Sequence, residues 1–177
     1  MFYAKVLLMK EICTPALVLN KEPLHDSDCR VTLFSRDLGK IYAKVKSGRR
    51  LTSKLAPHLE PLSLVTVRLV GKNGFQVTDA LKFASLPLSQ LKIARLLDAV
   101  LTEGGNDHKL WSALLGGKLG FTEVLVLLGL DPKFASCENC GAAPEYFSAK
   151  SSSYSCRKCA SGAAESYVKG DYFELSV

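Results

Sequence analysis

Residues 30–46, RVTLFSRDLGKIYAKVK, decide the fold of the first half of this 177-residue chain. Two runs of alternating apolar and polar residues flank the tripeptide Asp37-Leu38-Gly39. Alternation with a period of two indicates strands that bury one face. A three-residue link ending in glycine predicts a hairpin with that glycine in the left-handed conformation. The face assigned to the core consists of Val31, Leu33, Ile41, Ala43 and Val45.

The outer face of this hairpin is the main candidate for binding. The expected cross-strand pairs are Arg36–Lys40, Phe34–Tyr42, Thr32–Lys44 and Arg30–Lys46. Aromatic rings stack on bases and cations follow phosphates, so this face suits single-stranded nucleic acid. The alternative is that Phe34 and Tyr42 form a cross-strand pair that only stabilises the sheet. With the basic loop that follows, the candidate nucleic-acid contacts are Arg30, Phe34, Arg36, Lys40, Tyr42, Lys44, Lys46, Arg49, Arg50 and Lys54.

Charge is distributed unevenly along the chain. Its formal net charge is +6, but residues 1–85 carry +7 and residues 86–177 carry −1. Residues 30–54 alone hold eight basic residues and one acid, Asp37. A positive region confined to one segment indicates a polyanionic partner. The alternative is a solvated surface that keeps the protein soluble.

The first half of the chain contains five runs typical of short strands. They are Thr14–Asn20, Cys29–Ser35, Lys40–Ser47, Leu62–Val70 and Gly74–Lys82. Five short strands in about 70 residues predict a small closed barrel, because closure leaves no exposed sheet edge.

The second half changes to a helical pattern. Apolar residues recur at helical spacing after Pro87, and Gly104-Gly105 ends that segment. Further helices are expected at 108–115 and 121–128, and the last 18 residues should add a strand or a short helix. The sequence therefore predicts an α+β protein with a barrel domain at residues 1–84 and a helical domain at 85–177.

Four cysteines near the C-terminus form the motif C-x₂-C-x₁₅-C-x₂-C: Cys137, Cys140, Cys156 and Cys159. Two residues between the members of each pair let both thiolates turn onto one ion, and a 15-residue loop can bring the pairs together. Four thiolates suit a closed tetrahedral zinc site, which supports structure and has no open position for catalysis. The sequence predicts one structural Zn²⁺ in a knuckle at 137–159, with disulfides or spare thiols as the alternative.

Enzymatic motifs are weak in this sequence, and no catalytic residue is predicted. His58-Leu59-Glu60 matches the H-x-E of zinc deaminases, but no proline precedes Cys137 or Cys156 as that signature requires. The sequence also has no phosphate loop and no nucleophile elbow. No apolar run approaches the length of a membrane span and no signal peptide is visible, so a cytoplasmic location is expected.

Four stretches resemble RecO, the bacterial recombination mediator family. The first two are Ala16–Leu19 with the acidic turn Asp26-Ser27-Asp28, and Val31–Lys40. The third is Gly48-Arg49-Arg50 with Ser53 and Leu59-Glu60-Pro61-Leu62, and the fourth is Leu127–Pro132 running into the first cysteine pair. The resemblance implies an OB-fold barrel, then a helical domain that carries a zinc knuckle.

The resemblance also implies a function. RecO-like proteins bind single- and double-stranded DNA, anneal complementary strands and act in DNA repair without bond chemistry. The implied partners are RecR and the C-terminal tail of single-strand-binding protein, at gaps where a recombinase is loaded, and the implied location is the bacterial nucleoid. Two other functions stay open on the same face: an RNA-binding or ribosome-associated zinc-knuckle protein, and an adaptor for an acidic protein.

Overall fold

The computed structural model describes residues 10–71, 74–117, 119–161 and 172–175. The chain divides into two compact units. The first comprises Met1–Leu88 and Thr102–Asp107, and the second comprises Ser89–Leu101 and His108–Val177. The chain therefore passes from the second unit back to the first before it continues into the second.

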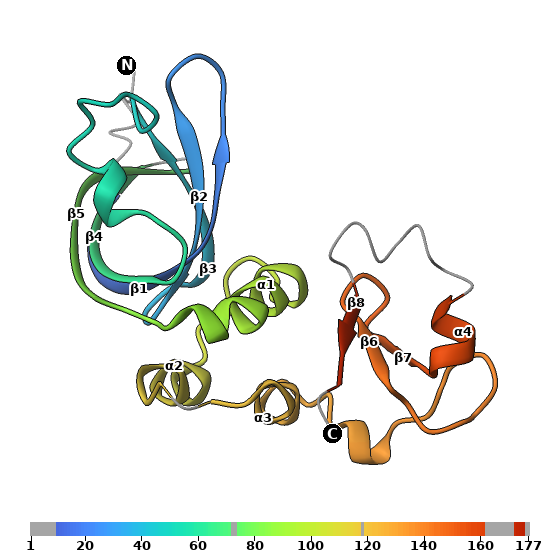
Figure 1. Cartoon of the computed structure of the whole chain (residues 1–177). Coiled ribbons are helices and arrows are strands. Elements are labelled where there is room, and N and C mark those ends of the chain that lie inside the picture. Colours follow the sequence, from blue (N-terminus) through green and yellow to red (C-terminus); the bar gives the residue numbers. More distant parts are fainter. Residues whose placement is uncertain (1–9, 72–73, 118, 162–171, 176–177) are drawn as a thin grey trace, which may run out of the picture. The chain divides into compact units, whose positions relative to one another are not determined.

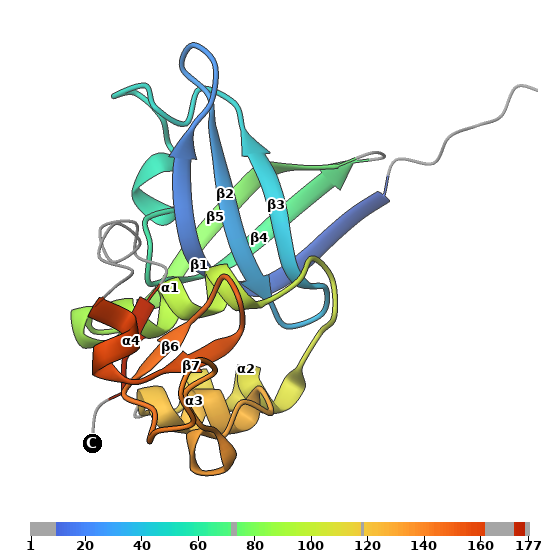
Figure 2. The ribbon, with the colours of Figure 1, turned by 90° about the vertical axis from the view of Figure 1, so that its right-hand side faces the viewer.

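The first unit is a closed five-stranded barrel, as the sequence predicts (Figure 1). Its strands are β1 (Lys10–Pro23), β2 (Cys29–Ser35), β3 (Gly39–Val45), β4 (Ser63–Gly71) and β5 (Phe75–Ser85). They follow one another around the barrel in the order β1-β2-β3-β5-β4, and β4 pairs with β1 to close it. Figure 2 shows β1, β2 and β3 side by side in one wall, which carries the predicted hairpin.

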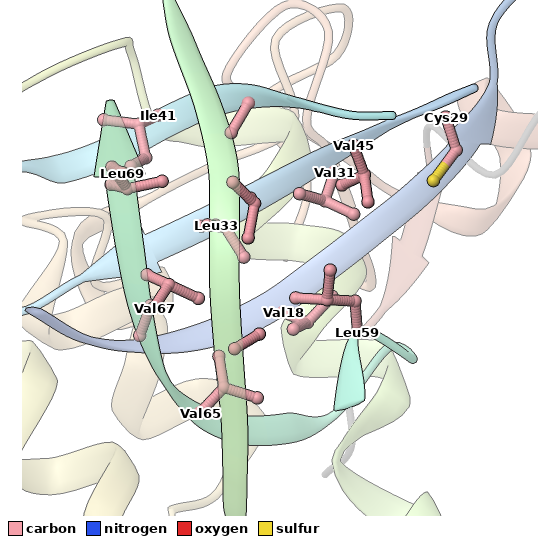
Figure 3. Packing of buried hydrophobic residues seen from close by; sticks show 14 residues of the cluster. Val18, Cys29, Val31, Leu33, Ile41, Val45, Leu59, Val65, Val67 and Leu69 are labelled. Atoms are coloured by element: carbon pink, nitrogen blue, oxygen red, sulfur yellow. The ribbon is translucent and has the colours of Figure 1, made fainter. Parts of the chain in front are cut away.

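Branched aliphatic side chains fill the barrel interior (Figure 3). All five residues assigned to the core face of the hairpin are buried there, so that assignment is confirmed. Leu59 follows the short 3-10 helix Ala56–His58 and is fully buried in the same cluster. Because burial of each such side chain contributes about 1.5–3 kcal/mol, this cluster is the main source of barrel stability.

The hairpin register differs from the predicted one by two residues. Ser35 pairs with Gly39, Thr32 with Tyr42, and Arg30 with Lys44. The turn is therefore residues 36–38, and Gly39 begins β3 in the left-handed conformation that was expected of it (φ +69°). A shift of two residues preserves the face of every side chain, which is why the core assignment survived the error.

One edge of β3 is covered by the segment that returns from the second unit. The Lys40 and Gly104 backbones form a bridge with N···O distances of 3.3 and 2.8 Å. β5 cannot supply these bonds, because it meets β3 only at Ala43↔Phe75 and Lys44↔Gln76. The bridge explains why Thr102–Asp107 groups with the barrel.

The second unit contains helices and a small three-stranded sheet. The helices are α1 (Leu91–Val100), α2 (His108–Leu115), α3 (Phe121–Leu127) and α4 (Arg157–Ser161). The sheet has the order β7-β6-β8, from β6 (Tyr146–Ser148), β7 (Ser153–Ser155) and β8 (Tyr172–Glu174). Of the strand or short helix expected in the last 18 residues, the structure contains a strand, β8, while residues 162–171 and 176–177 lie outside the described part. No helix of the described residues is long and apolar enough to cross a membrane.

Phe173 attaches β8 to the helices of this unit. Its ring stacks on Phe121 of α3 with a centroid distance of 5.6 Å. Lys92 of α1 donates to the carbonyl of Glu174 and lies over the Phe121 ring. The end of the chain thus joins the helices to the sheet that contains the cysteine motif.

Gly39→Ala tests the closure at the β3 edge. A Cβ at Gly39 would lie 2.3 Å from the carbonyl oxygen of Gly104, in addition to the strain of a positive φ. Gly105→Ala is the matched control, because Gly105 has a similar φ (+65°) and open space around its Cβ. The control should cost about 1–2 kcal/mol of unfolding free energy. Gly39→Ala should cost roughly 1–3 kcal/mol more in urea denaturation; equal costs would mean that the Gly104 contact contributes nothing.

Candidate metal centre and nucleic-acid interface

The four predicted ligand cysteines come together at one point. Their sulfur atoms all lie within 4.8 Å of one another, and none is in a disulfide. A tetrahedral zinc site with Zn–S bonds of about 2.3 Å requires S···S distances of about 3.8 Å. The Sγ atoms of Cys140 and Cys156 are already 3.5 Å apart. The cluster is therefore close enough to hold one metal ion.

Local backbone geometry positions the first cysteine pair. The amide of Gly141 donates to the carbonyl of Cys137 at 2.8 Å, and the amide of Cys137 donates to the carbonyl of Ala142 at 2.8 Å. This tight turn needs Gly141 in the left-handed conformation (φ +71°). The second pair brackets the start of α4, which turns Cys159 back toward Cys156.

The thiols of the cluster differ in how readily they lose a proton: the pKa is lowered at Cys137 but raised at Cys140 and Cys159. The backbone amide of Cys156 is the largest influence that lowers the pKa of Cys137, to about 6, and the amides of Asn139 and Cys140 add to it. Hydrogen bonds with Cys140 and the other thiols raise the pKa of Cys159 to about 12. Without a cation the cluster thus loses its protons in steps, whereas a divalent metal would favour the thiolate form of all four together, its charge offsetting half of theirs.

The sheet beside the cluster is joined to the helical part of the unit. The hydroxyl of Tyr154 donates to the carbonyl of Leu130, and its ring packs on Phe147 at 5.1 Å. Burial raises the pKa of Tyr154 to about 12, so the hydroxyl stays a donor at neutral pH. A metal that orders the cysteine loops would therefore stabilise this sheet and its attachment.

The barrel carries the second candidate site, and Tyr42 lies at its centre. The Tyr42 ring is 36% exposed. The guanidinium of Arg30 lies 5.5 Å from its centroid and the Lys40 ammonium 5.4 Å from it. Both cations hold the ring by cation–π attraction and place positive charge beside an aromatic surface.

The prediction that this whole face is exposed is wrong at two residues. Phe34 is fully buried (0%) and Lys40 is almost so (4%). They pair with each other across the hairpin, and Phe34 also pairs with Leu17 of β1. Phe34 therefore belongs to an apolar row outside the barrel interior, which alternation alone cannot distinguish from an exposed row.

Carboxylates partner three of the predicted cations. The ion pairs are Arg30–Glu22 at 2.6 Å, Lys44–Asp28 at 2.7 Å and Arg36–Asp37 at 2.9 Å. None of the ion pairs observed in the described part of the chain includes Lys46, Arg49, Arg50 or Lys54. The charge most available to an anion therefore lies in the loop that follows β3.

Residues 46–54, here called the basic loop, are anchored at two points. The amide of Arg49 donates to the carbonyl of Ser27 at 2.8 Å, and the amide of Ser47 to Asp28 Oδ1 at 2.8 Å. Gly48 permits this close approach, because a Cβ there would lie 2.5 Å from the sulfur of Cys29. Arg49 and Arg50 remain exposed on the anchored backbone.

A hollow of about 490 Å³ lies beside the basic loop and is lined by Arg49, Arg50, Ser53 and Lys21 among others. Lys21 is not among the predicted contacts, because the first strand was expected to end at Asn20 whereas β1 continues to Pro23. Lys21 pairs with Glu60 at 2.6 Å, so one carboxylate faces the same hollow. The polar run Asn20-Lys21-Glu22 shows no alternation that would have extended the strand, and its pairing with β2 is visible only in the structure.

A metal-free variant provides the first test of the cysteine cluster. Cys137→Ser should reduce the zinc content from one ion per chain to near zero and lower the thermal midpoint of the helical unit, because metal binding is linked to folding. Cys13→Ser is the control, since Cys13 is an exposed cysteine outside the cluster. Zinc content is measured by atomic absorption and unfolding by circular dichroism. Unchanged melting after verified metal loss would contradict a structural role.

Asp28→Asn tests the anchor of the basic loop by its pH dependence. The Lys44 ammonium, and then the Ser47 amide, hold the pKa of Asp28 below its ordinary value of 3.8. A lowered pKa stabilises the folded chain above that ordinary value, and the contribution is lost as the pH falls through the lowered pKa. The unfolding free energies of wild type and Asp28→Asn should therefore differ at pH 7 and converge below about pH 4. Asp26→Asn, in the same turn, is the control; a difference that does not shrink as the pH falls below about 4 would argue against the ion pair.

Comparison with known proteins identifies the barrel. The family Recombination protein O N terminal matches residues 9–86. The DNA repair protein RecO of Myxococcus xanthus is 32% identical over 154 residues, which cover 73% of this chain and 63% of that protein. DNA repair proteins RecO of Nocardioides sp. and Cutibacterium acnes are 38% identical over 66 residues and 36% identical over 78 residues. These alignments cover 37% and 42% of this chain, and 27% and 32% of the relatives.

The chain thus spans less than two thirds of the length of each of these relatives. The family match coincides with the barrel, and the 154-residue alignment is too long to be confined to it. The barrel at residues 9–86 therefore belongs to the family Recombination protein O N terminal, and the chain is a relative of the RecO DNA repair proteins.

Proposed function

We propose that this chain is a DNA-binding protein of recombinational repair that holds strands on its barrel and catalyses no reaction. The observation that carries the proposal is the anchored basic loop, in which Lys46, Arg49, Arg50 and Lys54 are exposed on a barrel of the RecO family. Phosphate contacts supply most of the affinity of such surfaces and need no particular base sequence. Arg30, Tyr42 and Lys44 would continue this surface along the barrel wall, where cations frame an exposed ring.

Arrangement of the charges favours single strands as the primary substrate. Tyr42 offers a face for an unstacked base once Arg30 moves aside, and duplex bases are already stacked. Neutralising phosphates on two strands would reduce their mutual repulsion, so annealing of complementary strands follows from the same surface. Duplex DNA can bind through its phosphates alone.

The finer role follows from the RecO relationship. The chain would assist recombinase loading at gaps coated by single-strand-binding protein, together with RecR, in the bacterial cytoplasm at the nucleoid. Contact with the tail of the coating protein is part of this proposal, although the chain is shorter than its relatives. The cysteine cluster would hold one structural Zn²⁺ and take no part in DNA chemistry, because all four ligand positions are filled by protein.

A triple alanine variant of the basic loop provides the test. Replacing Lys46, Arg49 and Arg50 should weaken binding of labelled single-stranded DNA and reduce the slope of log K against log salt by about 2, at roughly 0.7 per lost phosphate contact. The control removes Lys133, Lys150 and Arg95, three exposed cations of the second unit. Both are compared by fluorescence anisotropy across a salt series. Equal slopes for the two variants would refute the assignment of the loop.

Annealing of two complementary oligonucleotides, bare and coated with single-strand-binding protein, extends the test to function. Acceleration that falls with salt on both substrates is expected of a mediator. The absence of acceleration, with tighter binding to RNA of the same sequence, would instead favour an RNA-binding protein.

A further inference from the structure

A second hollow shares one lining residue with the hollow beside the basic loop. It measures about 420 Å³ and is lined by Pro57, His58, Lys82, Phe83, Ala84 and Ser85. Pro57 also lines the first hollow, which contains Arg49 and Arg50. The two depressions therefore share a lining residue in the 3-10 helix Ala56–His58, which passes beside β5 in Figure 1.

Phe83 is presented to solvent at the second hollow by a β-bulge. Leu64 pairs with Ala84 and the next residue of β4, Val65, pairs with Lys82, so Phe83 is the extra residue of β5. Bulges re-aim a side chain and are common at binding sites. Phe83 is 54% exposed, whereas Phe34 of β2 is fully buried.

The rim of the second hollow is polar and basic. Lys82 is exposed there, and its backbone amide donates to Nδ1 of His58 at 3.2 Å. Since Nδ1 accepts this bond, the proton of neutral His58 is on Nε2, which can donate to an anion. The one carboxylate that lines either hollow, Glu60, is in the first and is paired with Lys21.

We propose that a single nucleic-acid strand held by the basic loop continues over Pro57 and stacks a base on Phe83, with Lys82 contacting its phosphate. This inference rests on the proposed function and adds a binding residue on a face outside the β2–β3 wall. An aromatic ring beside a cation, at the end of a track of cations, is the combination that binds single strands without sequence preference. Double-stranded DNA would not use Phe83, because its bases are not available for stacking.

Phe83→Ala tests the stacking contact. Loss of one base–aromatic stack should weaken binding of oligo-dT by a factor between about 5 and about 150. The matched control is Phe134→Ala, which removes a 91% exposed phenylalanine from the second unit. Phe83→Trp should keep the affinity and show quenching of its fluorescence by bound DNA. Thermal unfolding of each variant verifies the fold.

Strand length and salt separate Phe83 from the basic loop. The loss caused by Phe83→Ala should appear with oligonucleotides of about 16 nucleotides and disappear with those of about 4, which cannot reach both sites. The salt slope should stay at the wild-type value for Phe83→Ala and fall by about 0.7 for Lys82→Ala. Affinity for a blunt duplex should not change with Phe83→Ala.

The outcomes distinguish this inference from the proposed function. If Phe83→Ala binds the long oligonucleotide with wild-type affinity while the basic-loop variant binds weakly, the stacking site alone is overturned. Phe83 would then be a contact for another kind of partner. Failure of the wild-type chain to bind single strands overturns both. A length-dependent loss confined to Phe83→Ala, absent from Phe134→Ala, supports the path over Pro57.

Discussion

Closure of the barrel at β3 is the constraint on which the rest of the first unit depends. β5 reaches β3 for only two residue pairs, so most of the β3 edge needs hydrogen-bond partners from elsewhere. Gly104 supplies one such pair, and only glycine at position 39 lets the two backbones approach. An open edge would invite pairing with other chains. The closed sheet in turn fixes β2 and β3, and with them the start of the basic loop.

The carboxylates of this barrel determine, as much as its cations do, where positive charge stays available to an anion. Glu22 and Asp28 neutralise cations of the wall, and Asp28 also binds the backbone of the loop through Ser47. The same acidic turn therefore lowers the charge of the wall and fixes the loop that keeps its charge. Exposed ion pairs of this kind contribute little stability by themselves. Their larger effect is on where a polyanion finds unpaired cations.

The sequence predicted the barrel, helices α1, α2 and α3 and the cysteine cluster, because each shows a period or spacing typical of its structure. It did not predict α4, β6 or β7, which are each only three to five residues long. Alternation placed the core face of the hairpin correctly, yet it could not exclude a slip of two residues. It also could not show that Phe34 lies in a buried row outside the barrel interior. Phe83 was missed for a different reason: the predicted strand ended at Lys82, whereas β5 continues to Ser85, and no residue type marks the bulge at Phe83.

The order of the segments along the chain affects how the barrel folds during synthesis. The segment at 102–107 completes the barrel, although the chain forms α1 of the other unit before it. During synthesis from the N-terminus, the β3 edge at Lys40 therefore stays unpaired until residue 104 has left the ribosome, even though β5 is complete at Ser85. A fragment ending at residue 88 would contain all five strands and still expose that edge. The barrel thus finishes folding only when the translated chain extends well past its last strand.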